Sequence, residues 1–380
     1  MQGHNILHLC FDGNFINKSS TIFEHFYPGR NIFCIIRRSS IKGQMLNVEN
    51  AIWLDSVHPE PALLERICEE KQVGTILMHG LHPNYSKALP LLSANHTRRI
   101  YWIFHGYELY YALGEKGLWK LVDNESIFSI DSWISPTRYN YYLRKFTGQK
   151  IYYDHLVEAL PWIDYFCFWL YEDYLLLKEH FSTNIAFKHF QYSAYFQTYK
   201  DVPEPLEVQK TAKEIRINHS ASKTGNHDTI MNLLHKIDAK NEFRKVVPLS
   251  YGSKYMRKQI SKMGYRLFGQ QFVPELDYVS LEEYRATLRK VGVAIFGHCR
   301  QEASGNIVAL LRSGAKVFLR ERNFLLKHYR DLGFIVFSVE KDLKTIDDLQ
   351  PLTVEQMQHN AEVAVKSRVF YEDFMPQLLD

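Results

Sequence analysis

Apolar positions in the first third of the chain fall into short continuous runs separated by polar segments. Runs rich in Ile, Leu and Phe are typical of buried strands, and they lie at residues 5–11, 31–37, 51–54, 74–80 and 99–106. Among them, residues 61–72 (PALLERICEEKQ) place apolar side chains at helical spacing. Strands that alternate with helices predict a parallel sheet with both faces covered.

The same alternation returns in the second half of the chain. Strands are predicted at 214–218, 244–249, 291–296 and 316–320, and helices at 228–237, 254–264, 280–291 and 306–314. Residues 200–213, with two prolines and mixed charge, are typical of a linker, whereas the aromatic stretch 133–199 gives no readable pattern. We therefore predict an α/β protein with two Rossmann-like domains, 1–205 and 206–365, that face a central cleft. The segment 366–380 could return to the first domain as a helix.

The composition is that of an ordinary globular protein, with 46% hydrophobic and 23% charged residues over 380 positions. The five cysteines are scattered and form no C-x-x-C pair, so neither a disulfide framework nor a zinc site is indicated. This cysteine usage points to a reducing compartment. A formal net charge of +4 permits a polyanionic partner without requiring one.

Two segments bear on a membrane location. Residues 158–177 are the most apolar stretch, but they contain four carboxylates and do not read as a bilayer span. Residues 135–153 interleave aromatic side chains with Arg138, Arg144, Lys145 and Lys150. That mixture suits an anionic headgroup surface, although a core helix with a solvated basic edge fits equally well. Because no signal peptide is indicated, we expect a cytoplasmic protein, or one that rests on the membrane without crossing it.

Two polar loops follow predicted strands of the second domain, at 217–228 (INHSASKTGNHD) and 297–306 (GHCRQEASGN). In open α/β sheets, ligands bind at the carboxyl ends of strands, where loops and helix N-termini converge. Each loop offers hydroxyls, amides, a glycine and one cation, which suits a diphosphate. Small polar residues at helix starts are also ordinary caps, and for either loop alone the two interpretations are balanced. Neither loop contains a Walker or G-x-G-x-x-G motif.

Five segments together resemble the bacterial Fuc4NAc transferases of enterobacterial common antigen synthesis, glycosyltransferase family 56. They are MHGLHPN (78–84), YWIFHGYELYYALGEKGLWKLV (101–122), NHSASKTGNHD (218–228), KVVPLSYG (245–252) and the segment 278–323 around GHCRQEASGN. The resemblance implies a GT-B fold with the donor nucleotide on the second domain and no essential metal. It also implies inverting transfer of a deoxy-amino sugar from a TDP- or UDP-sugar to a polyprenyl-diphosphate-linked oligosaccharide, on the inner face of the cell membrane.

The resemblance also implies roles for individual residues. The donor site would be lined by Ser220, Ser222, Lys223, Thr224, Asn226, His227, Tyr251, Gly252, Arg300, Gln301, Ser304, Gly305 and Asn306. The acceptor side would include His79, Gly80, His105, Gly106, Glu108, Leu109 and Tyr110. The chain departs from the family pattern in three places: His105 stands where a Trp is expected, Glu108 replaces an Asp, and residues 133–199 have little counterpart.

Transfer to a hydroxyl needs a base, and Glu108 is our candidate, with His79 as its rival. A Glu paired with a nearby cation and a His held in a turn are the plainer interpretations of these residues. There is no Asp-x-Asp, and Asp123 in the sequence DNE (123–125) is expected to lie in a solvated turn. A sugar-nucleotide epimerase is the alternative enzyme. An RNA-binding module is the non-enzyme alternative, although no nucleic-acid motif occurs, and the lack of G-x-S-x-G argues against a serine hydrolase.

Overall fold

The structure is a computed structural model that describes residues 4–11, 13–36, 48, 51–54, 59–95, 97–123, 145–148, 150–197, 206, 210–211 and 213–380. Contacts divide the chain into two compact units. The first contains Met1–Leu118, Asn140–Tyr199 and Val369–Asp380, and the second contains Trp119–Tyr139 and Lys200–Arg368. Sequence analysis assigned residues 119–123 to the first domain, but they pack in the second unit, where the Trp119 indole donates to the Cys299 carbonyl.

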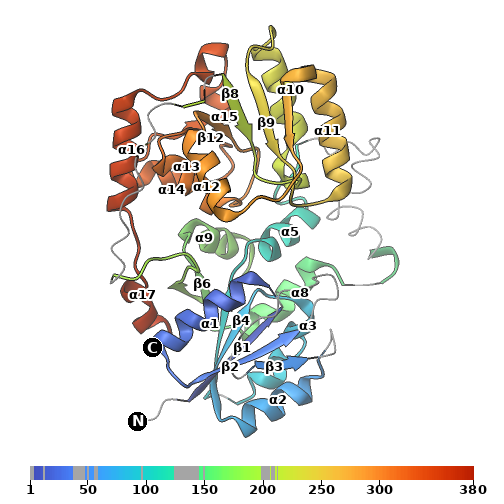
Figure 1. Cartoon of the computed structure of the whole chain (residues 1–380). Helices are drawn as coiled ribbons and strands as arrows, with labels where there is room; N and C mark the ends of the chain where they lie inside the picture. The colour runs from blue at the N-terminus through green and yellow to red at the C-terminus, as the bar shows by residue number, and fades with distance from the viewer. Residues whose placement is uncertain are drawn as a thin grey trace. The chain divides into compact units, whose positions relative to one another are not determined.

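The first unit is built on a seven-stranded sheet in the order β3-β2-β1-β4-β5-β6-β7, with every neighbouring pair parallel. The strands are β1 (Asn5–Phe11), β2 (Asn31–Ile36), β3 (Ala51–Leu54), β4 (Val73–His79), β5 (Arg99–Ile103), β6 (Tyr165–Phe168) and β7 (Ala186–His189). The helices are α1 (Asn14–Phe26), α2 (Pro61–Glu70), α3 (Pro83–Ser86), α4 (Leu89–Leu92), α5 (Tyr107–Glu115), α8 (Tyr152–Ala159), α9 (Tyr171–His180) and α17 (Tyr371–Leu378) (Figure 1). Every residue of β2 is buried, as expected for a parallel strand covered on both faces.

The second unit has a six-stranded parallel sheet in the order β10-β9-β8-β11-β12-β13. Its strands are β8 (Glu214–Ile217), β9 (Arg244–Pro248), β10 (Phe272–Glu275), β11 (Val293–Ile295), β12 (Lys316–Leu319) and β13 (Phe337–Ser338). Its helices are α10 (His227–Ile237), α11 (Lys254–Phe268), α12 (Leu281–Lys290), α13 (Ser304–Arg312), α14 (Phe324–Asp331), α15 (Val339–Asp342) and α16 (Val354–Lys366). Helix α10 packs on α11, and α13 packs on both α12 and α16.

Each sheet contains a point where the strand order reverses. It lies between β1 and β4 in the first unit and between β8 and β11 in the second. In open α/β sheets, loops at the carboxyl ends of such strand pairs leave the sheet in opposite directions, and ligands commonly bind in the crevice between them. The loops singled out from the sequence follow β8 and β11, and both therefore lie at the reversal point of the second sheet.

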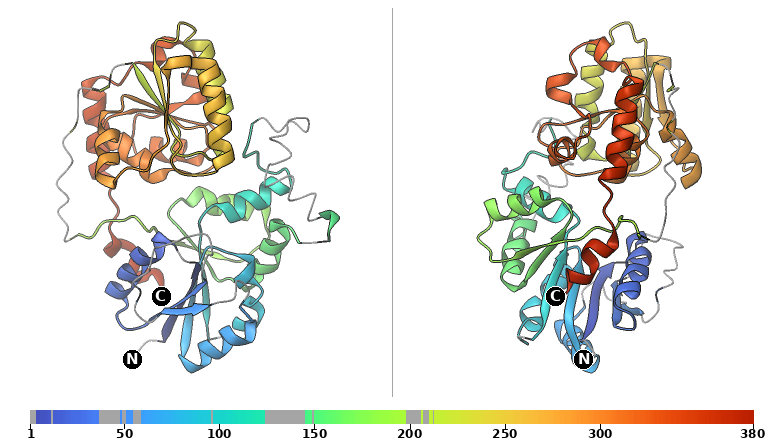
Figure 2. Two further views of the ribbon diagram at one scale, coloured as in Figure 1. Left: turned by 45° about the vertical axis from the view of Figure 1, so that its right-hand side comes forward. Right: turned by 90° about the vertical axis from the view of Figure 1, so that its left-hand side faces the viewer.

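Helix α17 belongs to the first unit, although the helix before it belongs to the second. Its Tyr371, Phe374 and Met375 join the apolar core that contains Phe23 and Leu77. Figure 2 shows the helix beside the sheet of the first unit in both views.

Candidate functional site

Asn218 joins the two polar loops of the second unit. It follows β8 with a left-handed φ of 57°, a conformation that Asn tolerates better than most residues. Its Nδ2 donates to the Gly225 carbonyl at 2.9 Å, and its Oδ1 accepts from the Gly297 amide at 2.8 Å. The loop after β8 and the loop after β11 are therefore held together by one buried side chain.

Asn226 fixes the same loops from the other end. Its buried Nδ2 donates to the carbonyls of Gly297 at 2.9 Å and Leu121 at 3.1 Å, and its Oδ1 accepts from the Asp123 amide at 2.9 Å. The resemblance gave Asn226 a place in the lining of the donor site. Its amide is instead occupied by backbone groups, so its contribution to the site is to position the loops.

A third loop, after β9, lies against the first. The Ala221 amide donates to the Tyr251 carbonyl at 2.7 Å, and the Ser253 amide donates to the Ala221 carbonyl at 3.1 Å. Gly252 sits in this contact with φ 109°, and a Cβ there would lie 2.7 Å from the Ala221 oxygen. Only glycine fits this close approach without strain. The Tyr251 side chain is 71% exposed at the same edge.

Side chains of the two loops form a polar chain that centres on Glu302, a residue that sequence analysis did not single out. Ser222 Oγ and Thr224 Oγ1 lie 2.6 Å apart, and Thr224 donates to Glu302 Oε1 at 2.6 Å. Arg300 Nε lies 3.0 Å from the same oxygen. Burial alone would raise the pKa of Glu302, but the charge of Arg300 and the hydrogen bond from Thr224 hold it below its ordinary value. The only sequence signal for Glu302 was its place inside the predicted loop.

Three histidines surround this chain. His298 is fully buried, and neither ring nitrogen has a hydrogen-bond partner among the described residues. The His219 ring lies 5.1 Å from it, centroid to centroid, and His219 Nδ1 also lacks a partner. Burial lowers the pKa of His219 to about 4 and that of His227 to about 3, with a further lowering from the neighbouring His298. All three imidazoles are therefore neutral at pH 7.

Helix α13 begins at the same edge, with Ser304 as its first residue. Ala303, with φ 60°, makes the sharp turn into the helix. The first amides of a helix have no partner within it and carry partial positive charge, so they form a ready anion site. A Cβ at Gly305 would meet nothing within 4 Å, which leaves open space there. Nearby, Gln301 is buried and its Nε2 has no partner among the described residues.

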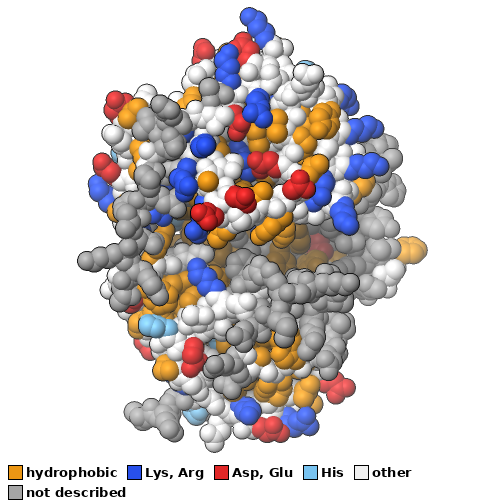
Figure 3. Space-filling view, in the orientation of Figure 1, with side chains coloured by type: hydrophobic (Ala, Val, Ile, Leu, Met, Phe, Trp, Pro, Cys, Tyr) orange, Lys and Arg blue, Asp and Glu red, His pale blue; other side chains and the backbone are white. Residues whose placement is uncertain are grey.

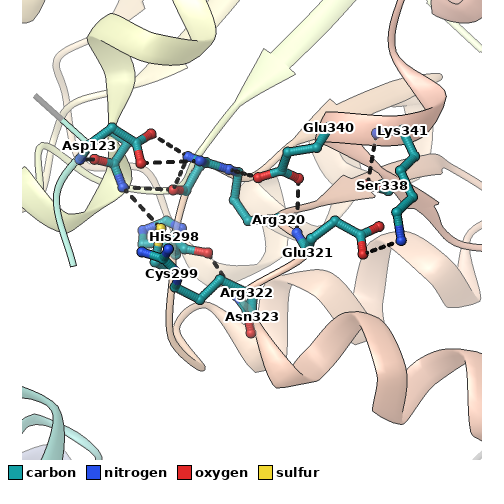
Figure 4. Close-up of polar contacts among 12 residues, drawn as sticks. Asp123, His298, Cys299, Arg320, Glu321, Arg322, Asn323, Ser338, Glu340 and Lys341 are labelled. Atoms are coloured by element: carbon teal, nitrogen blue, oxygen red, sulfur yellow. Dashed lines mark hydrogen bonds and ion pairs between the residues drawn. The ribbon is translucent and has the colours of Figure 1, made fainter. Parts of the chain in front are cut away.

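Arg320, after β12, binds Asp123 through two hydrogen bonds, at 2.6 and 3.1 Å, and its Nε lies 2.5 Å from Glu340 (Figure 4). The prediction of a solvated turn at Asp123 is wrong, because 18% of the Asp123 side chain is exposed and it is ion-paired. A hollow of about 400 Å³ lies beside this pair. It is lined by Lys120, Asp123, Arg320, Glu321, Arg322 and Glu340.

In the first unit, the residues expected on the acceptor side gather after β4 and β5. His79 Nε2 lies 3.0 Å from His8 Nδ1, and His79 Nδ1 lies 2.6 Å from the Tyr192 hydroxyl. That hydroxyl is also 3.2 Å from His105 Nε2. Tyr192 falls in the aromatic stretch that gave no readable pattern. Burial keeps the pKa of His79 well below its ordinary value, and both of its ring nitrogens are engaged.

Glu108 lies in the first turn of α5 with 3% of its surface exposed. Its Oε1 accepts from the Leu81 amide at 3.1 Å and from the Trp102 indole at 3.4 Å, whereas its Oε2 has no partner among the described residues. Burial raises the pKa of Glu108 to about 7. Gly80, with φ 85°, packs so closely that a Cβ would lie 3.3 Å from Glu108 Oε1.

Two further residues from the expected acceptor side have local roles. Gly106 precedes α5 with φ 98°, and the strand before it ends at Ile103, earlier than predicted. Tyr110 is fully buried, and its hydroxyl donates to Asp173 of α9. Its place is therefore in the packing between α5 and α9.

No protein-family model and no curated protein matches the chain. Among solved structures, it is similar to a glycosyltransferase from Rickettsia africae ESF-5, at 9% identity and a TM-score of 0.57 over 97% of this chain and 95% of that one. A sucrose-phosphate synthase from Thermosynechococcus elongatus matches at 8% identity and TM-score 0.62, over 97% and 96% of the two chains. An α,α-trehalose-phosphate synthase (UDP-forming) from Burkholderia vietnamiensis matches at 10% identity and a TM-score of 0.59, over 95% of this chain and 96% of that one.

The chain has the GT-B fold. Two parallel α/β sheets and these neighbours confirm the predicted class of two Rossmann-like domains. Among the described residues, no helix combines the length and apolar character that crossing a bilayer requires. Of the basic residues expected at a membrane surface, Arg138 and Arg144 lie outside the described residues. Lys145 is exposed, and Lys150 pairs with Glu158 at 2.6 Å.

Proposed function

We propose that the protein is a glycosyltransferase that moves a sugar from a nucleoside diphosphate to an acceptor hydroxyl. One observation carries this proposal: side-chain and backbone hydrogen bonds join the loops after β8, β9 and β11 at the reversal point of the second sheet, where α13 begins. Convergent small donors beside a helix N-terminus suit a diphosphate. The GT-B fold of the chain agrees with this reading.

The donor diphosphate would bind against the start of α13. Backbone amides at Ser304, Gly305 and Asn306 and the side chains of Arg300 and Gln301 would stabilise the negative charge that grows on the departing nucleotide. The open space at Gly305 allows a phosphate to approach the backbone. The loops after β8 and β9 would supply the remaining donor contacts through Ser220, Ser222, Lys223, Thr224, His227, Tyr251 and Gly252, with Asn226 holding the loops in place.

Glu108 would act as the base. Its Oε2, which has no hydrogen-bond partner among the described residues, would take the proton of the acceptor hydroxyl while that oxygen bonds to the anomeric carbon, and the bond from this carbon to the diphosphate oxygen breaks. A carboxyl group with a pKa of about 7 is suited to proton transfer near neutral pH. His79 is the weaker candidate because His8 and Tyr192 occupy both of its nitrogens.

The finer identity rests on the resemblance to the Fuc4NAc transferases. The donor would be a TDP- or UDP-linked deoxy-amino sugar, and the acceptor a polyprenyl-diphosphate-linked glycan of bacterial surface polysaccharide synthesis. Transfer would invert the anomeric carbon without metal in the chemical step. The protein would then work as a peripheral protein on the inner face of the cell membrane.

A sugar-nucleotide epimerase is the second candidate, because it would use the same donor loops. It would turn over donor without any acceptor, which separates it from a transferase. An RNA-binding role has less support, because no nucleic-acid recognition motif occurs in the sequence. Basic side chains do line the right-hand edge of the second unit in Figure 3, where α11 carries five Lys and Arg residues and no acidic one, but acidic side chains are interspersed with basic ones over the rest of that face.

Calorimetric titration with TDP, UDP, GDP and ADP, with and without magnesium, tests the donor site. Binding of TDP or UDP is expected, and Arg300→Ala should weaken it at least tenfold. Arg312→Ala, at the far end of α13, is the matched control and should bind as the parent does. Failure of all four nucleotides to bind would remove the donor-site assignment and leave the fold.

A further inference from the structure

The loops of the second unit also bring together His219, His298 and Glu302. One ligand atom from each of these residues lies within 4.8 Å of the others. His219 lies in the loop after β8, whereas His298 and Glu302 lie in the loop after β11. No short sequence motif therefore contains all three residues. Within the described residues, this is the one group of three such side chains with a metal-like spacing.

The orientation of Glu302 leaves one carboxylate oxygen for a further partner. Thr224 and Arg300 hold Oε1, at 2.6 and 3.0 Å. Oε2 faces His298 Nε2 at 3.6 Å, which is too long for a hydrogen bond. In metal sites, the ligating carboxylate is held by hydrogen bonds of this kind from surrounding groups.

The histidines show the complementary feature. Both nitrogens of the buried His298 and Nδ1 of His219 have no hydrogen-bond partner among the described residues. A buried imidazole nitrogen without a partner carries a free-energy cost that a ligand would remove. A neutral imidazole nitrogen presents the lone pair that a metal needs.

We propose that His219, His298 and Glu302 bind one divalent transition ion, such as Zn²⁺, which cross-links the loop after β8 to the loop after β11. Two imidazoles and one carboxylate are ligands that Zn²⁺ accepts, whereas Mg²⁺ prefers oxygen ligands. Three protein ligands leave a coordination position for water. The role assigned to the ion is to join the two loops, and the chemical step proposed above does not use it.

The experiment uses tag-free full-length protein that has been stripped with EDTA and dialysed. Calorimetric titration with Zn²⁺ should give one ion per chain, and Mg²⁺ should give no heat. Saturating Zn²⁺ should raise the melting temperature by about 5 °C, because an ion that binds only the folded chain stabilises it. Bound Co²⁺ in place of Zn²⁺ should show a visible absorption band.

His219→Ala and Glu302→Gln should each lower Zn²⁺ affinity at least tenfold and abolish the melting shift. The half-buried His219 is the first choice, because replacing the fully buried His298 risks misfolding. His235→Ala, on the exposed side of α10, is the control and should bind Zn²⁺ as the parent does. Absence of stoichiometric Zn²⁺ binding, or unchanged binding by His219→Ala, overturns the proposal. Nucleotide titration of the EDTA-treated protein tests the donor site without Zn²⁺. Failure of the zinc proposal can therefore be distinguished from failure of the proposed donor site.

Discussion

Two guanidinium nitrogens of Arg320 donate hydrogen bonds to Asp123, at 2.6 and 3.1 Å. This pair connects residues 119–123 to the loop after β12. The side chains are 11% and 18% exposed, which makes this a largely desolvated pair. Burial would raise the pKa of Asp123, but the hydrogen bonds and charge of Arg320 outweigh it and hold the pKa below 3.8. The pair therefore stabilises the fold above about pH 4, and this contribution is lost as the pH falls below that value.

Asp123→Asn should lower the free energy of unfolding by about 2 kcal/mol, because Arg320 keeps only Glu340 as a charged partner in that contact. Urea unfolding at pH 7 measures the loss. Asp331→Asn breaks the exposed pair with Lys327 and should cost under about 0.5 kcal/mol. Equal losses in the two variants would contradict the role given to Asp123.

Glu108 should make stability fall as the pH rises. Its folded pKa of about 7 lies above its ordinary value of 4.5, so the folded protein holds the proton more tightly than the unfolded chain does. The contribution of Glu108 to stability is then greatest below pH 4.5 and declines by roughly 3 kcal/mol up to about pH 7. Urea unfolding of Glu108→Gln should lack this decline. Glu179→Gln, on the exposed side of α9, should retain it.

The same group sets an expected rate profile. If Glu108 is the base, transfer should rise with pH through about 7 as the carboxylate forms, and Glu108→Gln should lower kcat by at least about 100-fold. Donor binding should be unchanged in this variant. Near-normal turnover by Glu108→Gln would rule the residue out as base.

Gly252→Ala should destabilise the protein by about 2 kcal/mol or more, because the added Cβ meets the Ala221 carbonyl and the backbone keeps a positive φ. Nucleotide binding should weaken as the two loops separate. Gly305→Ala is the control for stability: it lies in a helix with open space around it and should stabilise by roughly 0.5–1 kcal/mol. Thermal melts of both variants measure the difference.

Asn226→Gly keeps the left-handed backbone that φ 46° requires and removes only the side chain. The lost hydrogen bonds to Gly297, Leu121 and Asp123 should cost about 2–3 kcal/mol. Asn226→Ala should lose more, since its backbone is strained as well. If urea unfolding finds the glycine variant as stable as the parent, the side chain does not hold the loops.

Sequence patterns predicted most central strands and the edge strand β3, and they missed the interior strand β6 together with three edge strands. β1 is a mostly apolar run that contains His8, and its bounds are as predicted. β7, β10 and β13 are edge strands with partly exposed or short sequences, and β10 contains Pro274, so none of them has the apolar signature of a central strand. The predicted helix 254–264 continues to Phe268, past an internal glycine that marks no end.

The sequence predicted where the candidate site lies, but it did not predict which side chains contact one another there. Loops at the carboxyl ends of β8 and β11 could be chosen from strand order and polar content alone. Glu302 and Tyr192 were not singled out, and Asp123 was wrongly assigned to a solvated turn, because each has a partner far away in sequence, as Tyr192 shows with His79. Pairings of this kind form only in the packed tertiary structure. The local periodicity of apolar and polar residues does not reveal them.

The position of α17 has a consequence for synthesis. Its side chains complete the core of the first unit, yet they follow the whole of the second unit along the chain. As the chain leaves the ribosome, the first sheet emerges early with a gap in its apolar core, and it must wait for the second unit to be translated before that gap is filled. The core of the first unit is therefore completed only after the second unit has been synthesised.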